Sequence, residues 1–253
     1  MCFLKDKKKR KLFIILSSIF VVLIALFIAC AIYLGTYYHA DHSSITAFLP
    51  QDYSWDKGQD DTIAFYPKDN NPSAGLIFYP GGKVEHTSYI PLMHALSEQG
   101  FLCVLVKMPF NLAVFDINAA DGIKEEYPDV ATWYIGGHSL GGSMAAYYID
   151  SHPDDFKGLL LLGSYSSKDL SSLDIGVLSI YGSEDLVLNK RKYKEALSNL
   201  PAGFDEIIIE GGCHAYFGMY GQQDGDGNPT ISNKDQILKT AQLVGQWAGT
   251  AEN

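Results

Sequence analysis

The most uneven pattern of polar and apolar positions lies at the start of the chain. Six basic residues fall between Lys5 and Lys11, and residues 12–34 then contain no charged side chain. A helix of that length rises about 35 Å at 1.5 Å per residue, which is enough to cross a hydrocarbon core of about 30 Å. The pattern predicts a cytoplasmic basic segment at residues 1–11 and a transmembrane signal anchor at residues 12–34.

The clustered cations also predict the orientation of this helix. Basic residues beside a membrane span tend to stay in the cytoplasm, so the rest of a single-pass cell-membrane protein is expected outside. Two alternatives remain open. A cleaved signal peptide has the same order of charges and apolar residues, although its apolar core is usually about 7–15 residues long. Residues 27–30 loosely resemble a lipoprotein cleavage box, in which Cys30 would carry the lipid.

A polar and aromatic stretch at residues 35–61 is typical of a linker, and short apolar runs then alternate with amphipathic segments. Apolar runs predict strands, and apolar residues at helical spacing predict helices. The predicted strands are Thr62–Tyr66, Ala74–Tyr79, Phe101–Val106, Thr132–Ile135, Gly158–Leu162, Val177–Tyr181 and Glu206–Ile209. The predicted helices are His86–Gln99, Val114–Glu126, Gly142–Asp150, Lys190–Leu200 and Lys234–Trp247. This order predicts an α/β domain at residues 62–250, with a mainly parallel sheet and helices on both faces.

Composition and charge exclude several classes of function. The chain is 47% hydrophobic, which is too apolar for a disordered protein. Its net charge is −10, and outside the first 35 residues 13 basic and 28 acidic residues leave −15. Such an acidic domain repels phosphate backbones, so no nucleic-acid partner is expected. The four cysteines have neither metal-ligand spacing nor the density of a disulfide-stapled domain.

The strongest chemical signal is the sequence Gly-Gly-His-Ser-Leu-Gly-Gly at residues 136–142, between a predicted strand and a predicted helix. In that setting G-x-S-x-G is a nucleophile elbow, a tight turn that exposes a serine hydroxyl. The turn requires small neighbours, which Gly137 and Gly141 provide. The helix that follows directs the partial positive charge of its N-terminus at the site. Ser139 is therefore the predicted nucleophile.

A serine hydroxyl needs a general base near neutral pH. Of the seven histidines, only His214 follows a late predicted strand, after two glycines. A carboxylate must orient this base, and Asp185 follows the strand Val177–Tyr181, with its neighbour Glu184 as the alternative. Because functional groups of such sheets gather beyond the carboxyl ends of the strands, we expect these side chains to meet Ser139 there.

Acyl transfer also needs donors for the oxyanion that develops on the substrate. One is expected to be the backbone N–H of Leu140, and the other the N–H of Gly82 or Lys83, in a glycine-rich loop after an early strand. No metal or organic cofactor is expected. Residues 224–228 weakly resemble a calcium loop, but Pro229 stands where glycine is needed and no glutamate closes it, so a solvated turn is preferred.

The triad in the order Ser139, Asp185, His214, together with residues 79–84, 106–112 and 214–218, resembles the α/β-hydrolase superfamily over about residues 62–250. It is similar to the bacterial α/β-hydrolase-fold-5 branch, which is compared with dienelactone hydrolases. The resemblance implies the α/β-hydrolase fold and acyl-type hydrolysis. The chain departs from dienelactone hydrolases, which use cysteine as the nucleophile. It also has Tyr-Pro-Gly-Gly at residues 79–82, where hormone-sensitive-lipase-like esterases have His-Gly-Gly-Gly.

The expected function is that of a membrane-anchored serine hydrolase of carboxylesterase type. Only residues 164–174 separate two strands between which many hydrolases insert a cap, so a shallow site for small or surface-exposed acyl esters is expected. Aromatic residues of the loop Ala215–Thr230 would either line this pocket or pack locally, and Cys213 would be an inert buried thiol. Two other functions remain open: an acyltransferase acting on envelope glycans, and a non-catalytic binding module, because fold does not fix function.

Overall fold

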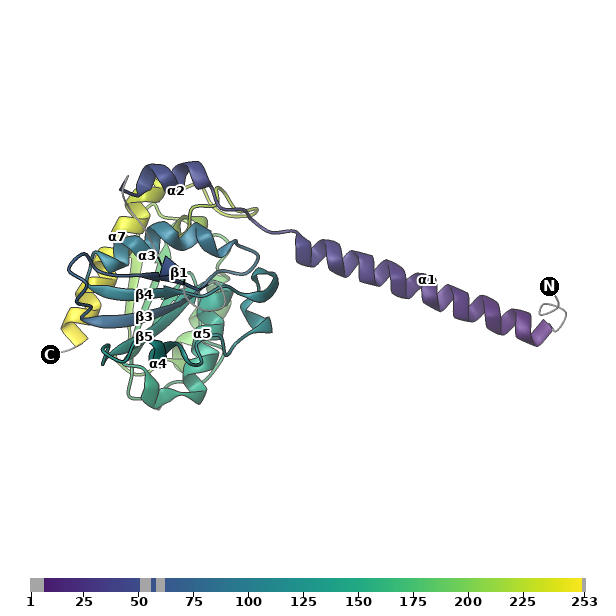
Figure 1. The fold of residues 1–253 in the computed structure, drawn as a ribbon, viewed down its shortest axis with the longest axis horizontal. Helices are drawn as coiled ribbons and strands as arrows, with labels where there is room; N and C mark the ends of the chain where they lie inside the picture. Colours follow the sequence, from purple (N-terminus) through teal and green to yellow (C-terminus); the bar gives the residue numbers. More distant parts are fainter. Residues whose placement is uncertain (1–6, 51–55, 58–61, 252–253) are drawn as a thin grey trace. The chain divides into compact units, whose positions relative to one another are not determined.

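The computed structural model describes residues 7–50, 56–57 and 62–251. They belong to two compact units, one ending at Tyr37 and one starting at Tyr38 (Figure 1). Residues 1–6 of the predicted basic segment lie outside the described residues, as do residues 51–55 and 58–61 of the predicted linker.

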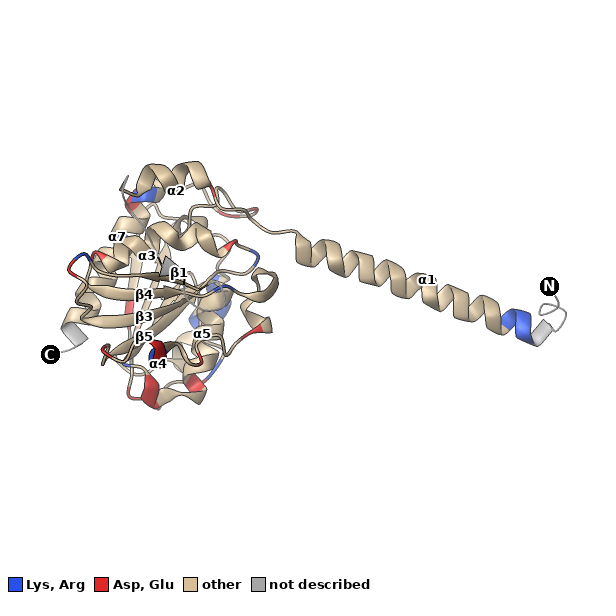
Figure 2. Ribbon diagram, viewed as in Figure 1, with Lys and Arg blue, Asp and Glu red and all other residues tan. Residues whose placement is uncertain are grey.

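The first unit contains the helix α1 (Lys7–Gly35). Mean hydropathy reaches 3.1 within Lys9–Gly35, and large apolar side chains are exposed at almost every position from Leu12 to Ile28. The basic residues of the helix gather at its N-terminal end (Figure 2). A helix that is apolar on all sides requires apolar surroundings. The helix α1 is therefore long and apolar enough to cross a membrane, a property that an anchor and a signal sequence share.

The second unit is built on a sheet whose described strands have the order β1-β2-β4-β3-β5-β6-β7-β8. These strands are β1 (Asp56–Lys57), β2 (Ile63–Phe65), β3 (Ala74–Tyr79), β4 (Phe101–Leu105), β5 (Trp133–His138), β6 (Gly158–Leu162), β7 (Gly176–Gly182) and β8 (Asp205–Ile209). The pairs β1–β2 and β2–β4 are antiparallel and the others are parallel. In the centre, Ile77 of β3 pairs with Val104 of β4 and Ile135 of β5. The predicted mainly parallel sheet is confirmed.

Helices cover both faces of this sheet (Figure 1). They are α2 (His42–Phe48), α3 (Ile90–Ser97), α4 (Ile123–Glu126), α5 (Leu140–Ser151), α6 (Lys190–Ala196) and α7 (Asn233–Ala251). Successive residues of a strand point to opposite faces, so Cys103 of β4 enters the core beneath α3 and α7, whereas Val104 enters the core beneath α5. The leucines of β6 are buried on both faces, which explains their uninterrupted run.

The helix predicted at Val114–Glu126 is wrong. A single 3-10 turn at Ala113–Phe115 is followed by irregular turns, and only Ile123–Glu126 is α-helical. Gly122 has a left-handed φ of 78°, which a continuous helix does not allow. The N–H of Ala120 donates to the hydroxyl of Tyr79 instead of to a helical carbonyl, so a contact with the sheet replaces the helical ladder.

Part of the segment expected to be a linker packs on the sheet domain. Tyr38 forms a parallel bridge with Val84, and the N–H of Asp41 donates to the carbonyl of Met219 at 2.8 Å. The carboxylate of Asp41 then caps α2, and Ile45 of this helix is buried in the core. The second unit thus starts ahead of the boundary at residue 62 that the sequence suggests.

Candidate active site

Ser139 occupies the turn that joins β5 to α5. Its backbone has φ 52° and ψ −121°, a conformation that costs a non-glycine residue roughly 1–3 kcal/mol. The glycines on either side make the turn possible, because a Cβ atom on Gly137 would lie 2.5 Å from the carbonyl oxygen of Tyr79, and one on Gly141 would collide with the same oxygen. The N–H of Ser139 donates to the carbonyl of Leu162 at 2.9 Å. These contacts confirm the predicted elbow geometry.

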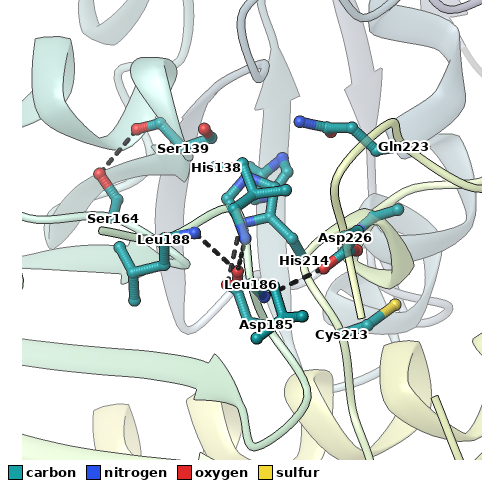
Figure 3. A network of polar contacts seen from close by, with 12 residues as sticks. His138, Ser139, Ser164, Asp185, Leu186, Leu188, Cys213, His214, Gln223 and Asp226 are labelled. Atoms are coloured by element: carbon teal, nitrogen blue, oxygen red, sulfur yellow. Dashed lines mark hydrogen bonds and ion pairs between the residues drawn. The ribbon is translucent and has the colours of Figure 1, made fainter. Parts of the chain in front are cut away.

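Asp185 and His214 form a hydrogen-bonded pair of buried side chains. His214 Nδ1 lies 2.8 Å from Asp185 Oδ2, and the two side chains are at most 1% exposed (Figure 3). Asp185 Oδ1 accepts the N–H groups of Val187 at 3.0 Å and Leu188 at 2.8 Å. The other carboxylate candidate, Glu184, accepts the hydroxyl of its neighbour Ser183. The structure thus places Asp185, and not Glu184, in hydrogen-bond contact with His214.

Ser139 and His214 line one pocket of about 250 Å3 beyond the carboxyl ends of the strands. His214 Nε2 is buried and has no hydrogen-bond partner within the described part of the chain. Nδ1 is bonded to the aspartate, so Nε2 is the nitrogen left for a proton from a serine hydroxyl. The structure therefore pairs His214 with Asp185 and places His214 and Ser139 at one pocket, while the catalytic roles of the three residues stay a prediction.

The two predicted oxyanion donors in the loop after β3, Gly82 and Lys83, have different surroundings in the structure. Lys83 has a left-handed φ of 62°, and its N–H donates to the carbonyl of Asn111 at 2.7 Å, so this group is already used. Gly82 lies beside the elbow, because a Cβ atom there would be 2.8 Å from Leu140 Cδ2. Within the described residues, the N–H groups of Gly82 and Leu140 donate no hydrogen bond. The bonded N–H of Lys83 does not favour its predicted role, and Gly82 and Leu140 remain as candidate donors.

A tyrosine–histidine pair beneath this loop escaped the sequence analysis. The hydroxyl of Tyr89 accepts the N–H of Gly81 at 3.0 Å and shares a 2.7 Å hydrogen bond with His138 Nδ1. The ring of His138 packs on the ring of His214, with 4.5 Å between centroids. Burial, and secondly the neighbouring His214, hold the pKa of His138 well below its usual value, so this ring stays neutral.

The wall of the pocket comes from elements that the sequence did not indicate. Its lining includes Tyr165, Val187 and Leu188, from the loops after β6 and β7. By contrast, the aromatic loop after His214 packs locally, because Phe217 and Tyr220 are buried in the core that α3 and α7 cover. Of the two roles considered for this loop, local packing is the one observed.

The backbone before His214 is clamped by the last helix. Gln236 of α7 is fully buried; its Oε1 accepts the N–H of Cys213 at 3.0 Å, and its Nε2 donates to the carbonyl of Cys213 at 2.8 Å. Burial is the main reason that the pKa of the Cys213 thiol is raised to about 12, which agrees with an inert thiol. Gln236 lies on the buried face of α7 with Ile237, Thr240 and Val244, and a glutamine on such a face is the sequence signal that could have revealed it.

A nucleophile on the turn after a central parallel strand, followed along the chain by its acid and its base, is the arrangement of an α/β hydrolase. Comparison with known families agrees. Residues 75–238, more than half of the chain, match the Alpha/beta hydrolase family, and the protein belongs to this family. The resemblance suggested by the sequence is confirmed. No protein with a curated description matches the chain.

Solved structures show the same fold. The esterase domain of a Rhodothermus marinus protein has a TM-score of 0.57 at 12% identity, over 77% of this chain and 96% of its own. Dienelactone hydrolase from Anabaena variabilis gives 0.54 at 17% identity, over 76% and 93%. Monoacylglycerol lipase from Paleococcus ferrophilus gives 0.56 at 12% identity, over 79% and 100%.

Proposed function

We propose that the protein is a serine hydrolase that cleaves carboxylic esters through an acyl-enzyme. The observation that carries the proposal is the buried Asp185–His214 pair: His214 Nε2 is unpartnered in the described structure, and His214 lines the same pocket as Ser139. The strained turn at Ser139 supports it, because such strain is retained where the surroundings over-determine it, often at active sites.

In the proposed reaction, Ser139 Oγ attacks the carbonyl carbon of the ester while His214 Nε2 takes the hydroxyl proton. Asp185 stabilises the imidazolium that forms. The N–H groups of Gly82 and Leu140 would bind the oxyanion of the tetrahedral intermediate. The carbon–oxygen bond to the alcohol then breaks and the alcohol leaves with the proton of His214. Water, deprotonated by His214, attacks the acyl-enzyme, and the carboxylic acid and free Ser139 are released.

A small acyl group is the proposed substrate class. The pocket volume of about 250 Å3 and its apolar wall at Val187 and Leu188 favour a short chain over a long one. The named structural neighbours include an esterase domain and a monoacylglycerol lipase, and these names agree with an ester substrate. We expect hydrolysis rates of p-nitrophenyl esters to fall as the acyl chain lengthens.

We further propose that α1 anchors the protein in the cell membrane, with the N-terminus in the cytoplasm and the hydrolase unit outside. The apolar stretch Lys9–Gly35 and the basic residues before it support this. Mass spectrometry of the mature protein tests it. An intact N-terminus supports the anchor, a start beyond residue 30 indicates a cleaved signal peptide, and a lipid on an N-terminal Cys30 indicates a lipoprotein.

The catalytic proposal is tested on the full-length protein in detergent with a fluorophosphonate probe. We expect a single adduct on Ser139 and no labelling or ester turnover in Ser139→Ala. Ser143→Ala is the matched control, because Ser143 lines the same pocket and is expected to keep both. No labelling of folded wild-type protein would favour a binding module. Products that appear only when a glycan acceptor is added would favour an acyltransferase.

A further inference from the structure

The loop after His214 contains an aspartate that does not behave as part of a solvated turn. Asp226 is half-buried, and its Oδ2 accepts the N–H of Ala215 at 2.9 Å. Its Oδ1 accepts the N–H of Gly227 at 2.9 Å and, at a longer 3.4 Å, the N–H of Leu186 (Figure 3). One carboxylate therefore bonds to backbone from three segments of the chain.

Two of these donors are the direct neighbours of triad residues. Ala215 follows His214, and Leu186 follows Asp185. We infer that Asp226 is a positioning residue. It links the loop that contains His214 to the loop that contains Asp185 and so fixes the Asp185–His214 hydrogen bond. The inference rests on the proposed function, because the positioning matters only if these two side chains act together on Ser139.

The surroundings of Asp226 support a fixed position for its carboxylate. Its own N–H donates to the carbonyl of Gln223 at 3.1 Å, which closes a tight turn. The next residue, Gly227, packs directly on the backbone of Glu184, where a Cβ atom would collide with the carbonyl oxygen. The turn therefore packs against Glu184, which precedes Asp185, and from this position the Asp226 carboxylate binds the N–H of Ala215 next to His214.

The backbone around His214 is thus hydrogen-bonded on both sides of this residue. Gln236 binds the N–H and the carbonyl of Cys213, and Asp226 binds the N–H of Ala215. Because His214 Nδ1 lies 2.8 Å from Asp185 and His214 also lines the pocket of Ser139, a shift of this backbone would misdirect the base. Displacements of about 1 Å in an active site can lower rates by about 100-fold.

The test compares Asp226→Ala and Asp226→Asn in the full-length protein in detergent, with Asp224→Asn as the matched control. Asp224 is exposed in the same turn; its N–H donates to the hydroxyl of Tyr38, and its carboxylate has no hydrogen bond to the described residues. We expect Asp226→Ala to lower kcat for a p-nitrophenyl ester roughly 10- to 100-fold, with KM close to wild-type. Asp226→Asn keeps one carbonyl acceptor and should lie between, whereas Asp224→Asn should match the wild-type.

The low-field proton resonance of the His214 Nδ1–H gives a readout that needs no substrate. We expect this resonance to be sharp in the wild-type and in Asp224→Asn, and broadened by exchange in Asp226→Ala. An Asp226→Ala protein with wild-type kcat and a sharp resonance overturns the inference. So does a variant whose melting temperature falls while kcat and the resonance stay unchanged.

The two proposals fail in different ways. If the wild-type protein hydrolyses no ester and takes up no fluorophosphonate, the proposed function fails. The comparison of the resonance between wild-type and Asp226→Ala would still decide whether Asp226 positions His214.

Discussion

Gly163 lies directly against the imidazole of His214. A Cβ atom on Gly163 would be 2.9 Å from His214 Nδ1 and 3.2 Å from Asp185 Oδ2, and the residue has a left-handed φ of 51°. It follows the last residue of β6, which lies between β5, the strand before Ser139, and β7, the strand before Asp185. Because no side chain fits there, the glycine is required by the site as well as by its backbone.

We predict that Gly163→Ala lowers kcat for ester hydrolysis by roughly 100-fold, because the methyl group would displace the base by a few tenths of an ångström or more. Gly203→Ala is the control, since Gly203 also has a positive φ, 88°, but an added Cβ would meet nothing within 4 Å. Both variants should lose about 1–2 kcal/mol of stability from backbone strain. Equal kcat values in the two variants would contradict the predicted clash.

We predict that Tyr89→Phe lowers kcat, because Tyr89 holds the loop after β3 that contains the candidate oxyanion donor Gly82. The change removes the acceptor for the Gly81 N–H and the partner of His138 Nδ1, which leaves buried groups unpaired and costs about 1–3 kcal/mol of stability. Tyr193→Phe is the matched control, because its buried hydroxyl bonds Ser179 and Glu206, and neither residue lines the pocket. It should lose similar stability and keep its kcat. If both variants keep wild-type turnover, the loop after β3 does not depend on Tyr89.

We predict that Gln236→Leu destabilises the protein by about 1–3 kcal/mol for each of the two backbone groups of Cys213 that it leaves unpaired. Urea unfolding of the full-length protein in detergent measures this change. Gln242→Leu, on an exposed position of the same helix, should be near neutral. An equal effect of the two substitutions would show that the hydrogen bonds between Gln236 and Cys213 contribute nothing to stability.

We predict that stability falls as the pH drops below about 6.5, the usual pKa of histidine. Folded His138 has a pKa well below that value, chiefly because it is buried, so the unfolded chain binds a proton that the folded protein does not. The free energy of unfolding should therefore decrease by about 1.4 kcal/mol per pH unit from this one group, until the folded pKa is reached.

His138→Gln tests the source of that pH dependence. The variant should be less stable at pH 8, and its stability should decline less steeply with acid than that of the wild-type. His42→Gln, at an exposed position, should retain the wild-type slope. If the slope of His138→Gln equals that of the wild-type, other groups dominate the acid sensitivity.

The sequence predicted the parts of the molecule that have a period or a strong motif. The leucine run of β6 and the apolar run Phe101–Val106 had to be buried strands, and the ends of strands then located Asp185 and His214. The turns that replace the helix expected at Val114–Glu126 depend on Gly122 and on the sheet residue Tyr79, and no local pattern encodes that contact.

The residues that support the site could not be predicted from the sequence, for a related reason. Gln236 and Asp226 act on backbone groups of residues near His214, from positions that become neighbours only when the chain has folded. Gly163 is required because another loop fills the space beside it. Lys83 was chosen with Gly82 because both follow the same strand, and the carbonyl of Asn111, which takes its N–H, lies far along the chain.

The left-handed backbone of Ser139 restricts which atoms can ever replace its hydroxyl. A β-branched residue is the least tolerant of a positive φ, so threonine could not take over this position without deforming the turn. Cysteine has the same branching as serine and would fit the same dihedral angles. The backbone at position 139 is therefore compatible with the oxygen of serine or the sulfur of cysteine at the γ position, and incompatible with threonine.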